Sequence, residues 1–474
     1  MDSKAVLDIF KKITTIPRES GHVEQMGAWL QRWALDHKLQ CKWDKVGNIL
    51  IVKEASKGRE NIPAIVLQAH QDMVCEKNSG VKHDWSKDPI NYIIQDGWMI
   101  APDTTLGADD GIGIAAALAL LEDDVPSGKI EALFTVDEET SMDGAEALKA
   151  GFFSGKTLIN LDSEDEGQLF IGCAGGLNTN ISFNYGTEPL KAGWKTIRLN
   201  ISGGIGGHSG DDINKGRMNT LQQLCRFLYE EWGRGMQLCH LQGGGKSNAI
   251  AREAQAVIAV PDPEATAERF AQFGKTVNTE FHITDPDVKF AAEECCFQGD
   301  PMRKSNASKI IPALFACPHG AYAMSQDIKG LVQTSTNFAS VRMDKPGVME
   351  IVTSQRSPAH SERLSMADKV EAVFKLAGAK TKKVGEYPGW EPNTKSKILK
   401  ETVASYRKLF GKKPEVKAIH AGLECGLFLT KFPDLDMISF GPTLRGVHAP
   451  GEKMELASLD KFVALLQDVV VNFK

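Results

Sequence analysis

The chain has 474 residues, of which 42% are hydrophobic and 24% are charged, and its formal net charge is −6. This composition is typical of a soluble globular protein, and a length of about 150 residues per domain predicts two or three domains. The acidic balance argues against a nucleic-acid surface, and the longest apolar runs, of about ten residues, are too short to span a membrane. Scattered cysteines without a C-x-x-C pair favour a reducing, cytoplasmic location.

Strands and helices alternate through the first part of the chain. Residues 1–40 predict two amphipathic helices. Buried strands are predicted within 62–72, 130–140 and 157–167, and an apolar helix follows the loop that begins "TTLGADDG" and runs to about residue 122. This alternation predicts an α/β fold with a mainly parallel sheet and helices on both of its faces.

The pattern changes after "FIGCAGGLNT". A strand at 195–204 and a long helix at 213–232 open a region in which strands and helices have more polar faces. We expect an inserted α+β domain at 177–386, between two parts of one α/β domain at 1–176 and 387–474. The insert is long enough for two similar halves, although no sequence repeat shows them.

Side chains that bind metals follow the three buried strands. In an open α/β sheet, sites form at the carboxyl ends of the strands. Two further acidic residues lie in the loop before the apolar helix, and a histidine follows the late strand "DMISFG". The candidates are His70 and Asp72, Asp109 and Asp110, Glu138 and Glu139, Asp162, and His448. Such a set of histidines and carboxylates suits zinc or a similar divalent ion.

The spacing of these residues adds detail. Residues i and i+2 of a strand point the same way, so Asp72 can orient the imidazole of a metal-binding His70. Adjacent carboxylates at a strand end diverge, so that one of Glu138 and Glu139 can bind metal while the other faces an attacking water. Two bound cations need a shared anionic ligand, and a single aspartate between them is the usual solution.

The motifs together resemble a known family. "TLGADDGIG", "TVDEET", "LDSEDEG", "GCAGG", "GGHSG", "YPGWEPN" and "HAGLECGLF" occur in an order similar to that of the two-metal peptidases and deacylases, which include aminoacylases, carnosinases and glutamate carboxypeptidases. Within that family they look most like the bacterial aminoacyl-histidine dipeptidases. The resemblance implies a catalytic domain of the two-metal exopeptidase type with an inserted lid domain. It also implies metal-dependent hydrolysis of short peptides, above all Xaa-His dipeptides such as β-alanyl-histidine.

The resemblance also implies roles for the candidate residues. Two divalent ions are expected per subunit, zinc with cobalt or manganese as substitutes. The first ion is assigned to His70, Asp109 and Asp162, and the second to Asp109, Glu139 and His448. Glu138 is the implied general base, and Asp72 orients His70. The peptide bond after the bridging Asp109 is expected to be cis, and Asp110 stands where the family pattern has asparagine.

Four residues of the lid and a later loop complete the implied site. His208 of "GGHSG" is expected to stabilise the developing oxyanion, and Asn337, Arg356 and Gly422 are expected to contact substrate, with Arg356 binding the terminal carboxylate. Ordinary structural roles are the alternatives: a turn histidine packed among glycines for His208, and a surface ion pair for Arg356. Whether His208 acts within one chain or across a homodimer stays open.

Other functions also fit parts of the sequence. Within the family, the alternatives are a broader dipeptidase, a tripeptide aminopeptidase and an amino-acid deacylase. From other classes, Gly111-x-Gly113 before an apolar helix allows an NAD-dependent oxidoreductase, and the same fold allows a peptide-binding protein without catalysis. Two aspartates beside the glycines would repel a pyrophosphate, which disfavours the dinucleotide interpretation. We expect a small peptide as the partner, with no nucleic acid and no membrane.

Overall fold

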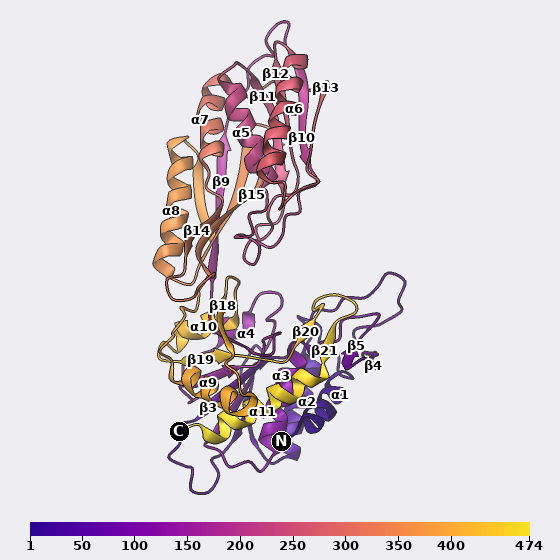
Figure 1. Ribbon diagram of the computed structural model, residues 1–474, viewed down its shortest axis with the longest axis vertical. Coiled ribbons are helices and arrows are strands. Elements are labelled where there is room, and N and C mark those ends of the chain that lie inside the picture. Colours follow the sequence, from indigo (N-terminus) through magenta and orange to yellow (C-terminus); the bar gives the residue numbers. More distant parts are fainter. The chain divides into compact units, whose positions relative to one another are not determined.

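The computed structural model describes residues 1–474, and the chain forms two compact units (Figure 1). The first unit is built from three segments and the second from two. The first contains Met1–Gly172, Trp390–Ala418 and Leu423–Lys474, and the second contains Cys173–Gly389 and Ile419–Gly422. None of the helices is both long and apolar enough to cross a membrane.

An eight-stranded mixed sheet forms the centre of the first unit. Its order is β1 (Gln40–Trp43), β2 (Ile49–Lys53), β6 (Ile130–Thr135), β3 (Ile65–His70), β7 (Thr157–Asn160), β19 (Asp436–Ser439), β8 (Gln168–Cys173) and β18 (Glu415–Ile419). The four strands β6, β3, β7 and β19 run parallel, whereas β1 pairs antiparallel with β2, β2 with β6, and β8 with β19. The predicted α/β class is confirmed, and its parallel part is the centre of the sheet.

Seven helices and a small second sheet complete the first unit. The helices are α1 (Ser3–Ile13), α2 (Glu24–Asp36), α3 (Ala108–Glu122), α4 (Asp143–Ala147), α9 (Lys397–Phe410), α10 (Glu424–Lys431) and α11 (Leu456–Asn472). The small sheet has the order β20 (Leu444–Arg445), β21 (Lys453–Glu455), β5 (Trp98–Ile100) and β4 (Ile93–Gln95). Helix α3 is buried along almost its whole length, between α1 and β3, which explains why its sequence has no polar face.

The second unit contains one long antiparallel sheet. Its order is β13 (Lys289–Cys295), β10 (Lys195–Ser202), β12 (Ala254–Val260), β11 (Gln237–Gly244), β15 (Val332–Lys345), β16 (Val348–Ser357), β9 (Gly175–Asn184) and β17 (Lys380–Tyr387), and β14 (Gly320–Met324) pairs with β15. Its helices are α5 (Thr220–Trp232), α6 (Pro263–Glu280), α7 (Lys304–Ala316) and α8 (His360–Leu376).

This sheet divides into two halves of the same topology. The first half runs β10, α5, β11, β12, α6, β13, and the second runs β9, α7, β15, β16, α8, β17, with β14 added after α7. Both are β-α-β-β-α-β units whose strands lie in the order fourth, first, third, second. The first half is inserted between β9 and α7 of the second, and the halves meet where β11 pairs with β15. The length of the inserted region allowed two similar halves, but no repeat in the sequence showed that they were present.

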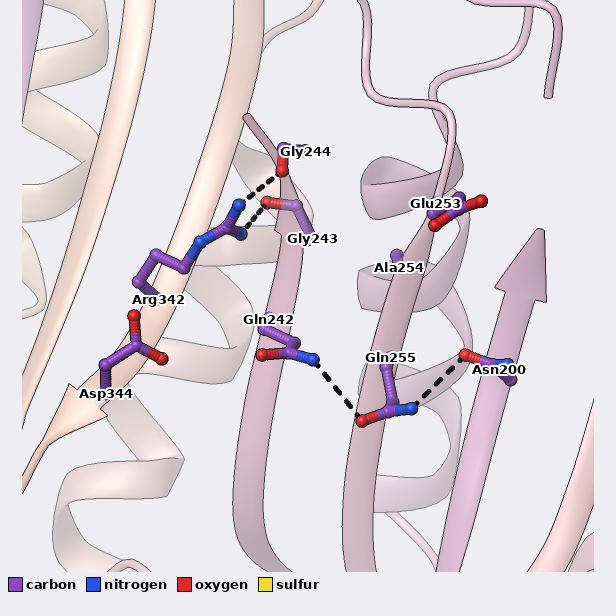
Figure 2. Close-up of a pocket in the computed structure, with 9 residues that line it drawn as sticks. All are labelled: Asn200, Gln242, Gly243, Gly244, Glu253, Ala254, Gln255, Arg342 and Asp344. Carbon is purple, nitrogen blue, oxygen red and sulfur yellow. Dashed lines mark hydrogen bonds between the residues drawn. The ribbon is translucent and has the colours of Figure 1, made fainter. Parts of the chain in front are cut away.

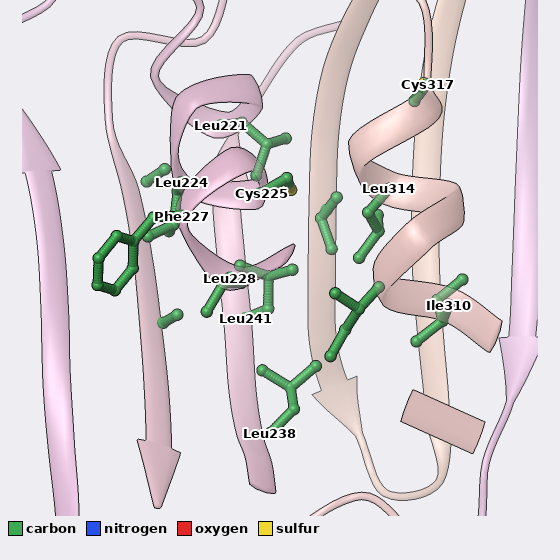
Figure 3. Close-up of a cluster of buried hydrophobic side chains, with 14 of the residues drawn as sticks. Leu221, Leu224, Cys225, Phe227, Leu228, Leu238, Leu241, Ile310, Leu314 and Cys317 are labelled. Atoms are coloured by element: carbon green, nitrogen blue, oxygen red, sulfur yellow. The ribbon is translucent and has the colours of Figure 1, made fainter. Parts of the chain in front are cut away.

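The helices of the second unit pack on one face of its sheet. Figure 3 shows Leu224 and Leu228 of α5 and Leu314 of α7 over Leu241 of β11, all within one continuous core. On the other face, Figure 2 shows a polar row in which Gln242 donates to Gln255 and Gln255 donates to Asn200, at 3.4 and 3.5 Å. One apolar and one polar face follow from the period of two along each strand.

The helix predicted at 213–232 was too long at its start. Helix α5 begins only after Asn219, whose side-chain Oδ1 accepts the N–H of Gln222. The preceding chain turns at Gly216, with φ of 69°, and Asp285 accepts the N–H of Met218. Helix α7 was not predicted at all, and it contains Pro312, a residue that normally argues against a helix.

Replacing Asn219, the buried N-cap residue of α5, should destabilise the second unit more than replacing Asp262, the exposed N-cap residue of α6. Asn219 is 1% exposed, and its amide also donates to the carbonyl of Phe338 at 2.8 Å. Asn219→Ala therefore removes a cap and also a hydrogen bond to a buried carbonyl, and we expect a loss of about 2 kcal/mol in the free energy of unfolding. Asp262→Ala, at the exposed cap of α6, should cost about half as much in the same urea titration. Equal losses would contradict this account.

Candidate metal centre

The ends of three parallel strands bring the first ligand candidates together. β3 ends at His70, which pairs with Thr135 at the end of β6, while Gln68 pairs with Asn160 of β7. Asp162 follows Asn160 by two residues and so lies level with His70. Parallel strands place their carboxyl ends at one edge of the sheet, and this edge therefore collects the side chains that follow each strand.

The carboxylate of Asp109 lies between two histidines. Its Oδ1 is 3.1 Å from Nε2 of His70, and its Oδ2 is 3.1 Å from Nε2 of His448. Asp162 Oδ1 lies 3.6 Å from the same His70 nitrogen, and Glu139 Oε1 lies 2.9 Å from the same His448 nitrogen. The structure thus brings all five predicted metal ligands together, with Asp109 in the central position.

Two buried charged residues hold the loop that carries Asp109. The carboxylate of Glu452 accepts the N–H groups of Leu106, Gly107 and Ala108 at 2.7 to 2.9 Å. The guanidinium of Arg18 donates to the carbonyl of Gly107 from the other side. A bare run of peptide N–H groups at a helix start attracts negative charge, and here Glu452 occupies it.

Asp110 has a structural role in the same loop. The Asp109–Asp110 peptide bond is cis, as the resemblance implies. The side chain of Asp110 accepts the N–H of Gly113 at 3.1 Å and the N–H of His70 at 3.3 Å, so it caps the regular part of α3 and ties it to β3. A Cβ at Gly113 would lie 2.2 Å from Oδ1 of Asp110, which explains the glycine there. Oxygens of Asp110 also come within reach of an ion at His70 and Asp162.

Asp72 connects two of the ligand segments. The ring Nδ1 of His70 lies 3.1 Å from the carbonyl oxygen of Asp72 and 3.4 Å from its Oδ1, which places the ring proton on Nδ1 and turns Nε2 toward Asp109. The same carboxylate accepts the N–H groups of Glu138 and Glu139 at 3.1 and 3.2 Å. Burial alone would raise the pKa of Asp72, but these contacts outweigh it and lower the pKa to about 2.

The chemistry of this donor set fits divalent cations. Burial raises the pKa of Asp162 and Asp110 well above the ordinary value, and the neighbouring Asp109 charge adds to both shifts. Burial also raises the pKa of Glu164 to about 7. Hydrogen bonds that the His448 ring donates to Asp109 and Glu139 raise the pKa of His448 to about 11. Carboxylates therefore outnumber the positive groups at this edge, and a bound cation would balance the excess charge.

Glu138 has the environment of a general base. Burial raises its pKa to about 7, the charges of Glu139, Asp109 and Asp72 add to the rise, and His70 opposes it. A carboxyl group with a pKa near neutrality can both accept and return a proton at physiological pH. Its neighbour Glu139 faces His448, with Oε1 2.9 Å from Nε2.

The second unit contains the other predicted residues. His208 precedes α5, and its Nδ1 lies 3.2 Å from Asp211 Oδ2 while its Nε2 lies 3.5 Å from Arg356 Nη2. The glycines of "GGHSG" have steric reasons: Gly207 has φ of 129°, and a Cβ at Gly210 would lie 2.4 Å from the carbonyl of His420. His208 and Arg356 therefore come together within one chain, from different halves of the second unit.

Asn337 and Gly422 lie elsewhere in this unit. The amide of Asn337 donates to the carbonyls of Ser247 and Ala249 at 2.9 Å, and Ala249 forms a β-bridge with His208. The Oδ1 atom of Asn337 is buried and has no hydrogen-bond partner. Gly422 lies in the loop between β18 and α10, two residues after His420. Asn337 thus supports the segment beside His208, and its acceptor remains available.

Several residues at these sites were not predicted from the sequence. Glu452 follows His448 by four residues in "HAPGE", and its closeness to that candidate ligand is the one sequence signal that could have indicated it. Glu424 lies in the quoted motif "HAGLECGLF", and its buried Oε2 accepts from Gln68 and Thr135 at 2.7 and 2.8 Å. No local pattern marks Arg18, because its acceptors come from residues 71, 72 and 107.

The fold and this site define a metal-binding hydrolase of the α/β exopeptidase type. The family model for peptidase family M20/M25/M40 matches residues 66–472. The cytosol non-specific dipeptidase of Escherichia coli (strain K12) is 40% identical and covers 98% of this chain and 96% of its own length. The crystal structure of aminoacylhistidine dipeptidase from Vibrio alginolyticus is 36% identical, with a TM-score of 0.92 over 99% of this chain and 96% of that one.

The chain belongs to peptidase family M20/M25/M40 and is a metallopeptidase. A more distant structure, the aminopeptidase PepT from Bacillus cereus, shares the fold at 15% identity with a TM-score of 0.62. The NAD-dependent alternative is wrong: the N–H groups before α3 are occupied by Glu452, and Asp110 occupies that of Gly113. The carboxylates that accept these N–H groups would repel a pyrophosphate.

Metal content should separate the two ligand sets. If Asp109 bridges, Asp162→Ala and His448→Ala should each leave about one zinc per chain, and Asp109→Ala should leave close to none, because both sites lose a ligand. Mass spectrometry of protein equilibrated with micromolar zinc and gel-filtered measures this. Asp165→Ala is the matched control, since Asp165 lies in the same loop but pairs with Arg445 at 2.7 Å. Loss of both ions in Asp110→Ala, with one retained in Asp109→Ala, would assign the bridge to Asp110.

Proposed function

We propose that this metallopeptidase hydrolyses dipeptides, with a preference for Xaa-His. We also propose that it uses two divalent ions, with zinc as the preferred metal at both positions. The observation that carries the proposal is the position of Asp109, with one oxygen facing His70 and the other facing His448. One shared carboxylate between two ligand sets is the arrangement expected of a two-cation hydrolase. The names of the two relatives, each matched over 96% of its length, support a dipeptide substrate.

The residues that would hold the ions follow from the contacts. His70, Asp109 and Asp162 would hold one, and Asp109, Glu139 and His448 the other. When bound, such ions polarise the scissile carbonyl and make a water easier to deprotonate. Asp72 would accept a hydrogen bond from Nδ1 of His70 through its oxygens, so that Nε2 is the nitrogen that faces the ion.

Glu138 would move the proton. Its carboxylate takes a proton from the attacking water and delivers it to the leaving amine, so the same group acts first as a base and then as an acid. The raised pKa of about 7, caused first by burial, suits both steps. Asp72 fixes the backbone of Glu138 at 3.1 Å and so holds this base in place.

The second unit would recognise the ends of the substrate and the developing charge. His208, oriented by Asp211, would donate a hydrogen bond to the oxyanion, and Arg356 would bind the terminal carboxylate of the dipeptide. Asn337 and Gly422 would contact the peptide backbone. His208 and Arg356 lie next to each other within one chain, so the two groups would act as a pair. A cytoplasmic location and a lid function for residues 177–386 belong to the same proposal.

Removing the metals should abolish the activity reversibly. Dialysis against a chelator should reduce dipeptide hydrolysis to background, and zinc, cobalt or manganese should restore it, since the carboxylate cluster alone cannot polarise a carbonyl. A panel of β-Ala-His, Gly-His, Gly-Leu, a tripeptide and an acetyl amino acid then tests the substrate class. Higher kcat/KM for the His dipeptides supports the proposed preference. Faster cleavage of the tripeptide or the acetyl amino acid would assign the chain to the aminopeptidase or deacylase alternative.

Glu138→Ala should separate catalysis from metal binding. The variant keeps every proposed ligand, so its metal content should equal that of the wild type, while kcat falls by about three orders of magnitude or more. Stopped assays of Gly-His cleavage measure kcat, and Glu146→Ala, at an exposed acidic residue of α4, is the control. Near-normal turnover with full metal content would refute the assignment of the base.

A further inference from the structure

Arg356 is a buried cation without a carboxylate partner. Its side chain is 7% exposed, Nη1 donates to the hydroxyl of Tyr387 at 3.0 Å, and Nε is buried without any acceptor. Arg363, which is 1% exposed and also has a buried Nε without an acceptor, differs in having a carboxylate partner, because it pairs with Glu386 at 3.0 Å and donates to the carbonyl of Ser357. A guanidinium stays charged at every physiological pH, and a buried one needs a compensating anion.

The register of the sheet explains how Tyr387 reaches Arg356. Ser335, Arg356, Gly176 and Tyr387 are paired in one row across β15, β16, β9 and β17. Side chains of directly paired residues lie on the same face of a sheet. Gly176 has no side chain, and a Cβ there would lie 2.6 Å from Cζ and the hydroxyl oxygen of Tyr387. The tyrosine ring therefore crosses over Gly176 to meet the guanidinium.

The other neighbour in this row is neutral. Ser335 lies 2.7 Å from Nε2 of His420 through its hydroxyl. Burial lowers the pKa of His420 to about 3, and the positive charge of Arg356 contributes to that shift. His420 therefore neither compensates Arg356 nor competes with it for an anion. Asp211 lies near this group and is held by His208 through its Oδ2.

We propose that Tyr387 is a positioning residue that holds the Arg356 fork for the carboxylate at the end of the substrate. The inference rests on the proposed function, in which Arg356 binds that carboxylate. By accepting from Nη1, the Tyr387 hydroxyl fixes the plane of the guanidinium before substrate arrives, which lowers the entropy lost on binding. The motifs "GCAGG" and "YPGW" are therefore structurally linked, because Gly176 of the first leaves space for the ring of Tyr387 of the second.

The test compares one dipeptide in two forms, the free acid and the C-terminal amide. For the wild type, the ratio of kcat/KM between acid and amide measures carboxylate recognition. Tyr387→Phe should lower kcat/KM for the acid about tenfold, through KM rather than kcat, and leave the amide unchanged. A purely structural role would lower acid and amide alike. Tyr322→Phe, at an exposed tyrosine of the same unit, is the matched control and should change neither.

Two further variants make the outcome decisive. Arg356→Lys should reduce the acid-to-amide ratio, and adding Tyr387→Phe to it should cause little further loss, because the tyrosine acts through the arginine. If Tyr387→Phe does not fold, Gly176→Ala replaces it in the test. The added methyl group displaces the tyrosine ring and should raise KM for the acid by a similar factor. An unchanged ratio in folded Tyr387→Phe, or additive losses in the double variant, would overturn the inference. Failure of the wild type to cleave any dipeptide would instead overturn the proposed function.

Discussion

The position of the Asp109 carboxylate is the constraint on which the rest of the first unit depends. Its two oxygens face histidines that are 378 positions apart in the chain, His70 and His448, so any shift of its loop would separate both ligand sets. The loop is held from two sides, by Glu452 through three backbone N–H groups and by Arg18 through the carbonyl of Gly107. Charged groups that never touch a ligand oxygen thus fix the ligand in place, as is common around metal sites.

Asp72 also fixes the positions of several residues of the metal site. It orients His70 and also accepts the N–H groups of Glu138 and Glu139, which places a ligand and the proposed base on a single anchor. Substitution of Asp72 therefore acts on three residues at once, and its effect cannot be read as the loss of one hydrogen bond. The buried carboxylate tolerates this position because several donors converge on it.

Much of the site could be predicted from the sequence because it lies at strand ends. His70, Glu138, Glu139 and Asp162 each follow a short apolar run, and parallel pairing brings such ends to one edge. Arg18 and the row of Gly176 and Tyr387 could not be predicted, since their contacts depend on segments far apart in the sequence. The duplicated halves of the second unit could not be predicted either, because one half is inserted into the other. The two halves have the same topology, but their sequences show no repeat. The start of α5 was misplaced because a turn at Gly216 interrupts an otherwise helical pattern.

The loop "LGADDGIG" shows why similar glycine patterns can serve opposite charges. A dinucleotide loop leaves its backbone N–H groups open to a phosphate. In this chain the corresponding groups are taken by protein carboxylates, Glu452 before the helix and Asp110 at Gly113. Gly111 is small because Arg18 and Phe10 press on it, with atoms 2.6 and 2.9 Å from where a Cβ would lie, so here the glycine serves close packing rather than ligand approach. With its own anions filling the helix start, the loop presents the remaining carboxylate, Asp109, to cations. The partners of the N–H groups, and not the spacing of the glycines, decide which charge such a loop binds.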